Sequence, residues 1–275
     1  MKRSLLWIGF FLLYIPAYSW DLLGNVGGRC TSMGSCSVAF CDFWSIQNNP
    51  AGLAKWRSLS AGISYENRFL MQELSYSNAA VVIPINIGTL GVSYSRFGFE
   101  GYNENNVGLA FARDFGPYLK MGLKIDYLSF RFSGDYATRR TATFEMGIQS
   151  DITNDLCLGV YIFNPINVKL KSIDNQHIPI VFKFGLSYNI TKDFIMAAEV
   201  EYDSDRKMDY RFGLEYLTTK DFYIRAGVHT NPGTACVGVG YSVSRVIIDV
   251  SATMNQLTGT TFQASLIFKI KEPKP

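Results

Sequence analysis

The residues best suited to metal binding or nucleophilic chemistry in this 275-residue chain are its five cysteines and two histidines. Cys30, Cys36 and Cys41 fall within twelve residues, whereas His177 and His229 stand far from them. Tetrahedral zinc sites usually show paired Cys-x-x-Cys or His-x-x-x-His spacing, and the sequence lacks both. We therefore expect no metal site. A Cys30–Cys36 or Cys36–Cys41 disulfide and simple packing roles for the thiols both stay open.

Nucleophilic and phosphate-binding motifs are also absent from the sequence. No Gly-x-Ser-x-Gly stretch occurs, and neither histidine belongs to a nucleophile–base motif. Gly27-Gly28 lacks the surrounding residues of a Walker or dinucleotide-binding loop. We predict that the protein is not an enzyme, has no catalytic residues and uses no cofactor.

Ionisable side chains instead occupy alternate positions in segments that we expect to be strands, on the polar face of each. Both signs of charge occur, so these residues can pair across strands and keep an enclosed interior polar. The alternative is that they line a substrate path. The residues expected to face such an interior are Lys120, Lys124, Asp126, Glu145, Lys183, Glu199, Arg211, Glu215, Arg225 and Asp249.

An amino-terminal leader is expected to direct the chain to its compartment. Residues 1–3 supply positive charge, residues 5–15 are almost purely apolar, and residues 17–19 place small side chains where a signal peptidase reads them. We expect a signal peptide over residues 1–19; an uncleaved membrane anchor is the alternative. Without Lys2 and Arg3 the net charge falls from +3 to +1, which does not favour nucleic acid as a partner.

From Leu59 onward the sequence has a period of two, which is typical of half-buried strands. Residues 119–127, for example, read Leu-Lys-Met-Gly-Leu-Lys-Ile-Asp-Tyr. A tight turn recurs at residues 153–156, 191–194 and 219–222. We predict about fourteen strands of 9–12 residues over residues 58–270, with short turns at one end and a tail at 271–275. The longer polar stretches expected at the other end are Glu66–Glu73, Gly98–Asn105, Arg131–Arg140, Asn164–Ile178, Asp203–Lys207, Thr230–Gly233 and Asn255–Gly259.

Two architectures satisfy this alternation, a soluble β-sandwich and a transmembrane β-barrel. The leader, the alternating loop lengths, the tyrosines at strand ends and the charged, glycine-rich polar face favour the barrel. A closed barrel also leaves no exposed sheet edges. After residue 20, no run approaches the ~20 apolar residues that a spanning helix needs. The sequence therefore predicts an all-β, transmembrane, antiparallel barrel.

Residues 20–57 precede the strands and lack their alternation. A barrel of about fourteen strands has an interior wider than its wall side chains fill, so we expect this segment to fold into the lumen as a plug. A periplasmic tail is the alternative. Asn49-Pro50 is expected to begin a turn or short helix, with Pro50 in its first position.

The same segment resembles the amino terminus of the FadL-type outer-membrane barrel superfamily, and is most similar to its PorV/PorQ-like branch. The resemblance implies a fourteen-stranded barrel closed by an N-terminal hatch. It covers about forty residues by motif, and three features depart from the pattern: short loops, the cysteines, and the tail after the last strand. The residues that carry the resemblance, which we call the hatch motif, are Gly28, Arg29, Met33, Gly34, Asn48, Asn49, Pro50, Ala51, Gly52 and Leu53.

Members of this superfamily either carry hydrophobic compounds or serve type IX protein secretion, so the resemblance implies two hypotheses. The first is a conduit for hydrophobic small molecules, with ligand contacts from Phe40, Phe43, Trp44 and Leu53. The second is a plugged scaffold that docks secretion-system proteins. A soluble exported β-domain is a third reading. We expect the outer membrane of a Gram-negative bacterium as the location and its lipid as a partner.

Overall fold

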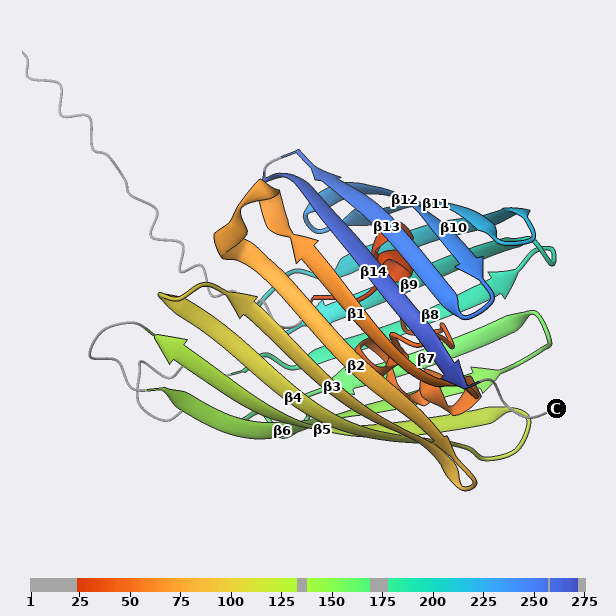
Figure 1. The fold of residues 1–275 in the computed structure, drawn as a ribbon, viewed down its shortest axis with the longest axis horizontal. Coiled ribbons are helices and arrows are strands. Elements are labelled where there is room, and N and C mark those ends of the chain that lie inside the picture. The colour runs from red at the N-terminus through yellow and green to blue at the C-terminus, as the bar shows by residue number, and fades with distance from the viewer. Residues whose placement is uncertain (1–23, 133–137, 169–177, 257, 272–275) are drawn as a thin grey trace, which may run out of the picture.

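The strands form because apolar and polar side chains alternate along them, and they close into one barrel (Figure 1). The computed structural model describes residues 24–132, 138–168, 178–256 and 258–271. Each strand pairs with its neighbours in sequence, and the ring closes where β1 pairs antiparallel with β14, with Ile63 opposite Leu266. This confirms the predicted closed antiparallel barrel of fourteen strands.

The strands run from 8 to 14 residues, a wider range than the 9–12 predicted. Their bounds are β1 (Leu59–Asn67), β2 (Ser75–Ile85), β3 (Gly88–Gly98), β4 (Tyr102–Asp114), β5 (Leu119–Phe132), β6 (Arg139–Asp151), β7 (Leu156–Phe163), β8 (Val181–Asn189), β9 (Phe194–Asp203), β10 (Asp209–Thr219), β11 (Phe222–Thr230), β12 (Gly233–Val243), β13 (Val246–Asn255) and β14 (Gly259–Lys271).

Three of the predicted long loops are short turns; in one of them β13 ends at Asn255 and β14 begins at Gly259. β3 ends at Gly98 and β4 begins at Tyr102, so Asn103–Asn105 belong to a strand although they are polar. Only Asn231 and Pro232 separate β11 from β12. The alternation of short and long connections is therefore not strict. Of Asn103, Glu104 and Asn105, only Glu104 lies in the lumen-facing phase of β4. The two asparagines lie in its outward phase, where Asn105 accepts from Tyr94 Oη at 2.8 Å. Most of Asn164–Ile178 lies outside the described residues.

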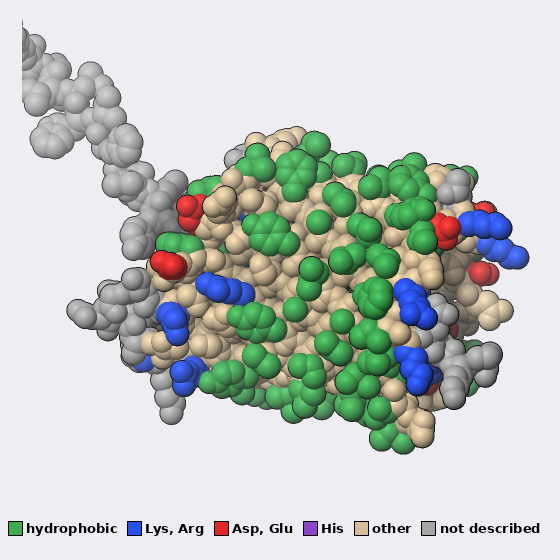
Figure 2. Space-filling model, viewed as in Figure 1, with side chains coloured by type: hydrophobic (Ala, Val, Ile, Leu, Met, Phe, Trp, Pro, Cys, Tyr) green, Lys and Arg blue, Asp and Glu red, His purple; other side chains and the backbone are tan. Residues whose placement is uncertain are grey.

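The barrel turns its apolar side chains outward. Ile63, Leu109, Phe212 and Met254 are each more than half exposed, and hydrophobic side chains spread over the barrel face while charged ones gather at its two ends (Figure 2). Among the described residues, no helix combines the length and the hydrophobicity needed to cross a bilayer. The six tyrosines that the sequence places at strand ends, Tyr65, Tyr94, Tyr127, Tyr188, Tyr216 and Tyr241, are all exposed on the outer surface. An apolar exterior around a polar lumen is the arrangement of a barrel that spans lipid.

Residues 24–57 pass through this barrel as three short helices joined by turns, α1 (Gly28–Ser32), α2 (Ser45–Asn48) and η2 (Pro50–Lys55). Gly24 shares a cavity with Arg206 and Pro232 at the end where β9–β10 and β11–β12 are joined. Lys55 shares a cavity with residues 153–155 at the opposite, short-turn end. The segment therefore extends along the lumen from one mouth to the other. Two further helices, η3 (Arg68–Leu70) and η4 (Gln72–Leu74), lie between β1 and β2.

Candidate functional site in the barrel interior

The hatch motif is placed by close backbone contact with the inner wall. Gly34 has a φ of +65°, which favours glycine, and a Cβ there would overlap the backbone of Phe212 and Val228. Met33, one residue earlier, is fully buried. At the start of α1, the Gly28 amide donates to Ser265 Oγ at 3.1 Å. These contacts explain why glycines recur in the first part of the motif.

Glycines on the wall side complete the contact, since they stand in the lumen-facing phase of their strands. A side chain on any of them would occupy space that the segment fills, so the wall is shaped for this segment. This is the structural reason for the glycine-rich polar phase of the sequence. The wall glycines on which an added Cβ would overlap the segment are Gly62, Gly91, Gly122, Gly147, Gly159, Gly185, Gly213, Gly227 and Gly238.

The second part of the hatch motif is fixed by asparagine side chains. Asn48 pairs with the backbone of Val26 through both amide atoms, at 3.0 and 2.9 Å. Asn49 accepts from the Ala51 amide at 3.1 Å and so caps η2, with Pro50 at its first turn as the sequence predicts.

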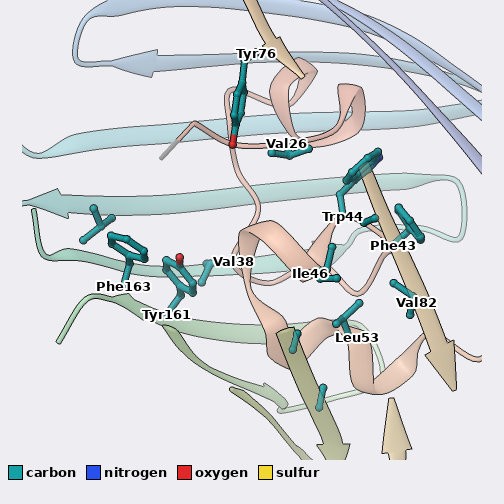
Figure 3. Close-up of a cluster of buried hydrophobic side chains, with 14 of the residues drawn as sticks. Val26, Val38, Phe43, Trp44, Ile46, Leu53, Tyr76, Val82, Tyr161 and Phe163 are labelled. Atoms are coloured by element: carbon teal, nitrogen blue, oxygen red, sulfur yellow. The ribbon is translucent and has the colours of Figure 1, made fainter. Parts of the chain in front are cut away.

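The remaining residues of the motif fill the space around that cap. A Cβ on Gly52 would overlap the Phe40 carbonyl oxygen. Ala51 and Leu53 are fully buried, and Leu53 packs near Ile46 and Val82 (Figure 3). The motif is thus a set of packing and capping residues.

One network of charges joins α1 to the wall. Arg29 donates to both carboxylate oxygens of Glu215, at 2.9 and 2.7 Å. Arg225 donates to the same carboxylate at 2.6 Å and to Asp249 Oδ1 at 2.6 Å. Asp42 lies 3.5 Å from Arg29. Two guanidinium groups and three carboxylates, from the segment and from β10, β11 and β13, therefore pair in one network.

A second network fixes the turn after α1. Glu199 accepts from the amides of Ser37 and Val38 at 2.7 and 2.8 Å. The same carboxylate pairs with Arg211, whose guanidinium also contacts Glu201 at 2.7 Å. Burying a carboxylate is costly unless it is paired and hydrogen-bonded, and Glu199 meets both conditions here. Glu199 therefore holds the segment to β9.

Two further lysines are neutralised on β5. Lys124 Nζ lies 3.0 Å from Asp126 and 2.9 Å from Glu145, and it donates to Gln47 of α2 at 2.9 Å. Lys120 pairs with Asp151 at 2.6 Å.

All ten charged residues named from the sequence lie inside the barrel, each no more than 7% exposed. Lys183 is the one not yet described, and it pairs with Glu201 at 3.2 Å. These residues contact one another or the segment, which is the geometry of a structural network. No group of three or more His, Cys, Asp or Glu in the described ranges could hold a metal ion.

A cavity of about 320 Å³ lies between the segment and the wall near the short turns. Phe43 and Trp44 line it, together with Trp56, which sequence reasoning missed. Phe43 contacts both indoles edge-on, with ring centroids 5.0 and 5.9 Å apart. Trp44 Nε1 is buried and has no hydrogen-bond partner among the described residues. The segment therefore contributes three aromatic rings to the cavity, and one of these rings carries a donor without a partner.

The wall side of this cavity is an apolar collar at the short-turn end of the lumen. Each collar residue stands in the lumen-facing phase of its strand, which is otherwise polar. An apolar residue at such a position is the sequence signal from which the site could have been predicted. Charged side chains of both signs also line the cavity: Arg29, Lys192 and Arg225 with Asp42, Asp193, Glu215 and Asp249. The collar residues are Ile195, Leu217, Tyr223, Ile247 and Ile267.

Two residues expected as ligand contacts lie elsewhere. Phe40 packs with Met33 and Cys36 under the Arg29 guanidinium, whose carbon is 4.6 Å from the ring centroid. Leu53 is enclosed by the cluster shown in Figure 3. The segment has no regular periodicity, so its sequence does not show which way each side chain points. Residues that are neighbours in the sequence therefore face different surroundings. Phe43 and Trp44 are thus the two of the four that reach the cavity.

All five cysteines are free thiols, so neither Cys30–Cys36 nor Cys36–Cys41 is joined. Burial raises the pKa of Cys30 to about 12. Because only the thiolate reacts, Cys30 is expected to resist iodoacetamide in the folded protein at about pH 8, where the group stays protonated. Peptide mass spectrometry should find Cys30 alkylated only after unfolding. Rapid labelling of Cys30 in the native barrel would contradict its position.

These features define a class: a closed fourteen-stranded antiparallel barrel with an apolar exterior and its own N-terminal segment in the lumen. A comparison with solved structures finds the same fold in the toluene transporter TodX of Pseudomonas putida, at a TM-score of 0.70 and 10% identity over 92% of this chain and all of that one.

A FadL homologue from Pseudomonas aeruginosa (TM-score 0.67, 12% identity, 89% of this chain and 98% of that one) and the toluene transporter TbuX of Ralstonia pickettii (0.63, 12%, 89% and 97%) share it too. At these identities the likeness establishes the fold. No protein-family model matches the chain, and no curated protein sequence matches it either.

Proposed function

We propose that this protein is an outer-membrane conduit for hydrophobic small molecules. The observation that carries the proposal is the cavity between the segment and the apolar collar. A dry apolar cavity of roughly 150 Å³ already takes up benzene, so about 320 Å³ is ample for a single aromatic ring. The barrels of similar fold include proteins described as toluene transporters.

In this proposal residues 20–57 act as a plug and residues 1–19 as the export signal. The aromatic rings hold an apolar ligand, and an acceptor atom on that ligand would satisfy the free Trp44 donor. Passage requires the segment to shift, because it extends from one mouth of the lumen to the other. The PorV/PorQ-like assignment and the secretion scaffold rest on the sequence resemblance alone.

Binding of toluene to the purified barrel in detergent tests the proposal. Ile267 faces the cavity from β14, whereas its neighbour Leu266 faces outward and is 40% exposed. Ile267→Phe fills the cavity and is expected to weaken toluene binding at least about tenfold, or roughly 1.4 kcal/mol. Leu266→Phe adds the same volume outside and should leave binding unchanged.

The chain offers a built-in signal for this titration, because all four tryptophans lie at or before residue 56. The two within the described residues, Trp44 and Trp56, both line the cavity and lie outside the strands. Toluene bound at the collar should change the emission of Trp44 and Trp56, while an outer lipid-facing site should not. Equal affinity for toluene in wild type, Ile267→Phe and Leu266→Phe would contradict the proposed site.

A further inference from the structure

Two free thiols from distant parts of the sequence meet at the short-turn mouth of the barrel. Cys41 belongs to the irregular stretch between α1 and α2, and Cys157 faces the lumen as the second residue of β7. Gln149 of β6 anchors this stretch by donating to the carbonyls of Val38 and Phe40 at 2.9 and 2.8 Å. Cys41 is thereby held over β6, the strand that pairs with the β7 strand of Cys157.

A single ammonium group bridges the two sulfur atoms. Lys120 Nζ lies 3.4 Å from Cys41 Sγ and 3.8 Å from Cys157 Sγ. The same Nζ pairs with Asp151 at 2.6 Å, which fixes its position, and Cys41 Sγ donates to Gln149 at 3.0 Å. The two thiols are also close enough to interact with each other. Two nucleophilic groups and one cation therefore share one corner of the lumen.

This pair differs from the other cysteines in access. Cys30, Cys36 and Cys236 are buried, whereas Cys41 and Cys157 are partly exposed. Cys157 lines an open cavity of about 580 Å³ beside the short turns, and Cys41 lines the aromatic cavity. A small reagent can reach both sulfurs from the short-turn mouth.

We propose that Cys41 and Cys157 form a paired-thiol modification site for a disulfide oxidant, and that its product is a Cys41–Cys157 disulfide which fastens the segment to β7. The Cys41 thiolate attacks one sulfur of the oxidant R–S–S–R, forms a mixed disulfide and releases RS⁻. The Cys157 sulfur then attacks Cys41 Sγ, and the second RS⁻ leaves. Two protons pass to the released thiolates, so two thiols are oxidised and one disulfide is reduced to two RSH.

Electrostatics assign the attacking role to Cys41. The contact with the Cys157 thiol and the positive charge of Lys120 hold the pKa of Cys41 below its usual value, although burial opposes this. Joining the sulfurs requires an S–S distance of about 2.05 Å, so Cys41 has to move toward β7. The absence of regular secondary structure at residues 40 and 41 permits that shift.

The link would act as a latch. The hydrogen bonds that hold this stretch to β6 and β9 can open one at a time, whereas a covalent bond at the short-turn mouth prevents the middle of the segment from leaving the wall. The inference needs no ligand and stands apart from the proposed conduit, so either can fail alone.

The test treats the full-length folded barrel in detergent with oxidised glutathione, followed by unfolding, alkylation of the remaining thiols and peptide mapping. A peptide joined through Cys41 and Cys157 is expected in wild type and in the controls Cys30→Ser and Cys236→Ser. Cys157→Ser should instead retain glutathione on Cys41, and Cys41→Ser should form no such link. Lys120→Gln should slow the reaction several-fold at neutral pH.

Heat-dependent migration on a gel checks that each variant is still a folded barrel. The proposal is overturned if both thiols stay free in the folded, oxidised protein, if Cys41 joins Cys36 or Cys30 instead, or if glutathione is trapped on Cys157 in preference to Cys41.

Discussion

Arg225→Met is expected to lower the free energy of unfolding by about 3–5 kcal/mol, because it leaves a buried carboxylate without its partner. Arg225 is 4% exposed and contacts Glu215 and Asp249, each at 2.6 Å. Glu215 keeps Arg29 as a second partner, but Asp249 forms no other ion pair among the described residues. Methionine fills much of the volume, so the loss is mainly of charge. Urea unfolding of the barrel in lipid vesicles or detergent measures it.

The matched control for this change is Arg57→Met. Arg57 contacts Asp114 at the same 2.6 Å, but its side chain is 52% exposed. Exposed pairs of this kind contribute about 0–1 kcal/mol, so the control should be nearly neutral. Adding Asp249→Asn to Arg225→Met removes the stranded charge, and the double variant should lose less than the two single losses together. Equal losses for Arg57→Met and Arg225→Met would contradict a buried network.

The period-two pattern predicted the strands, because each strand has one face toward the exterior and one toward the lumen. The leader, the loop lengths and the charged polar face then favoured a barrel over a sandwich. Residues 119–127 show this alternation in the sequence and in the structure, where Lys120 and Lys124 point inward and Ile125 points outward. Closure followed from the need to hide sheet edges. The ends of β4 could not be predicted, since Asn103–Asn105 resemble a loop by composition.

The interior was harder to predict than the wall. Trp56 and Ile267 meet at one cavity only because the barrel closes β14 against β1, and no local pattern records that register. Cys41 and Cys157 come together for a different reason that is equally hidden in the sequence: their contact depends on where the irregular segment crosses β6. The hatch motif marked the segment, whereas the direction of each side chain along it depends on tertiary packing.

The second large effect is expected for Gly227→Val, which should displace the segment and leave the barrel closed. A Cβ at Gly227 would overlap the backbone of Met33 and Gly34, and backbone atoms that are packed against Phe212 cannot yield as a flexible side chain does. Overpacking of this kind costs about 1–3 kcal/mol or more. The strand itself accepts valine readily. The strain should therefore fall on the segment.

Gly233→Val is the control, because an added Cβ there has open space and the residue lies at the start of β12. In planar bilayers, Gly227→Val should conduct ions at a higher level than wild type and Gly233→Val should not. Trp44 emission should shift to longer wavelength in Gly227→Val as the indole meets water, while circular dichroism still reports the sheet. An unchanged conductance together with an unchanged Trp44 signal would mean that the wall, rather than the segment, absorbs the strain, and the segment would then not be a separable plug.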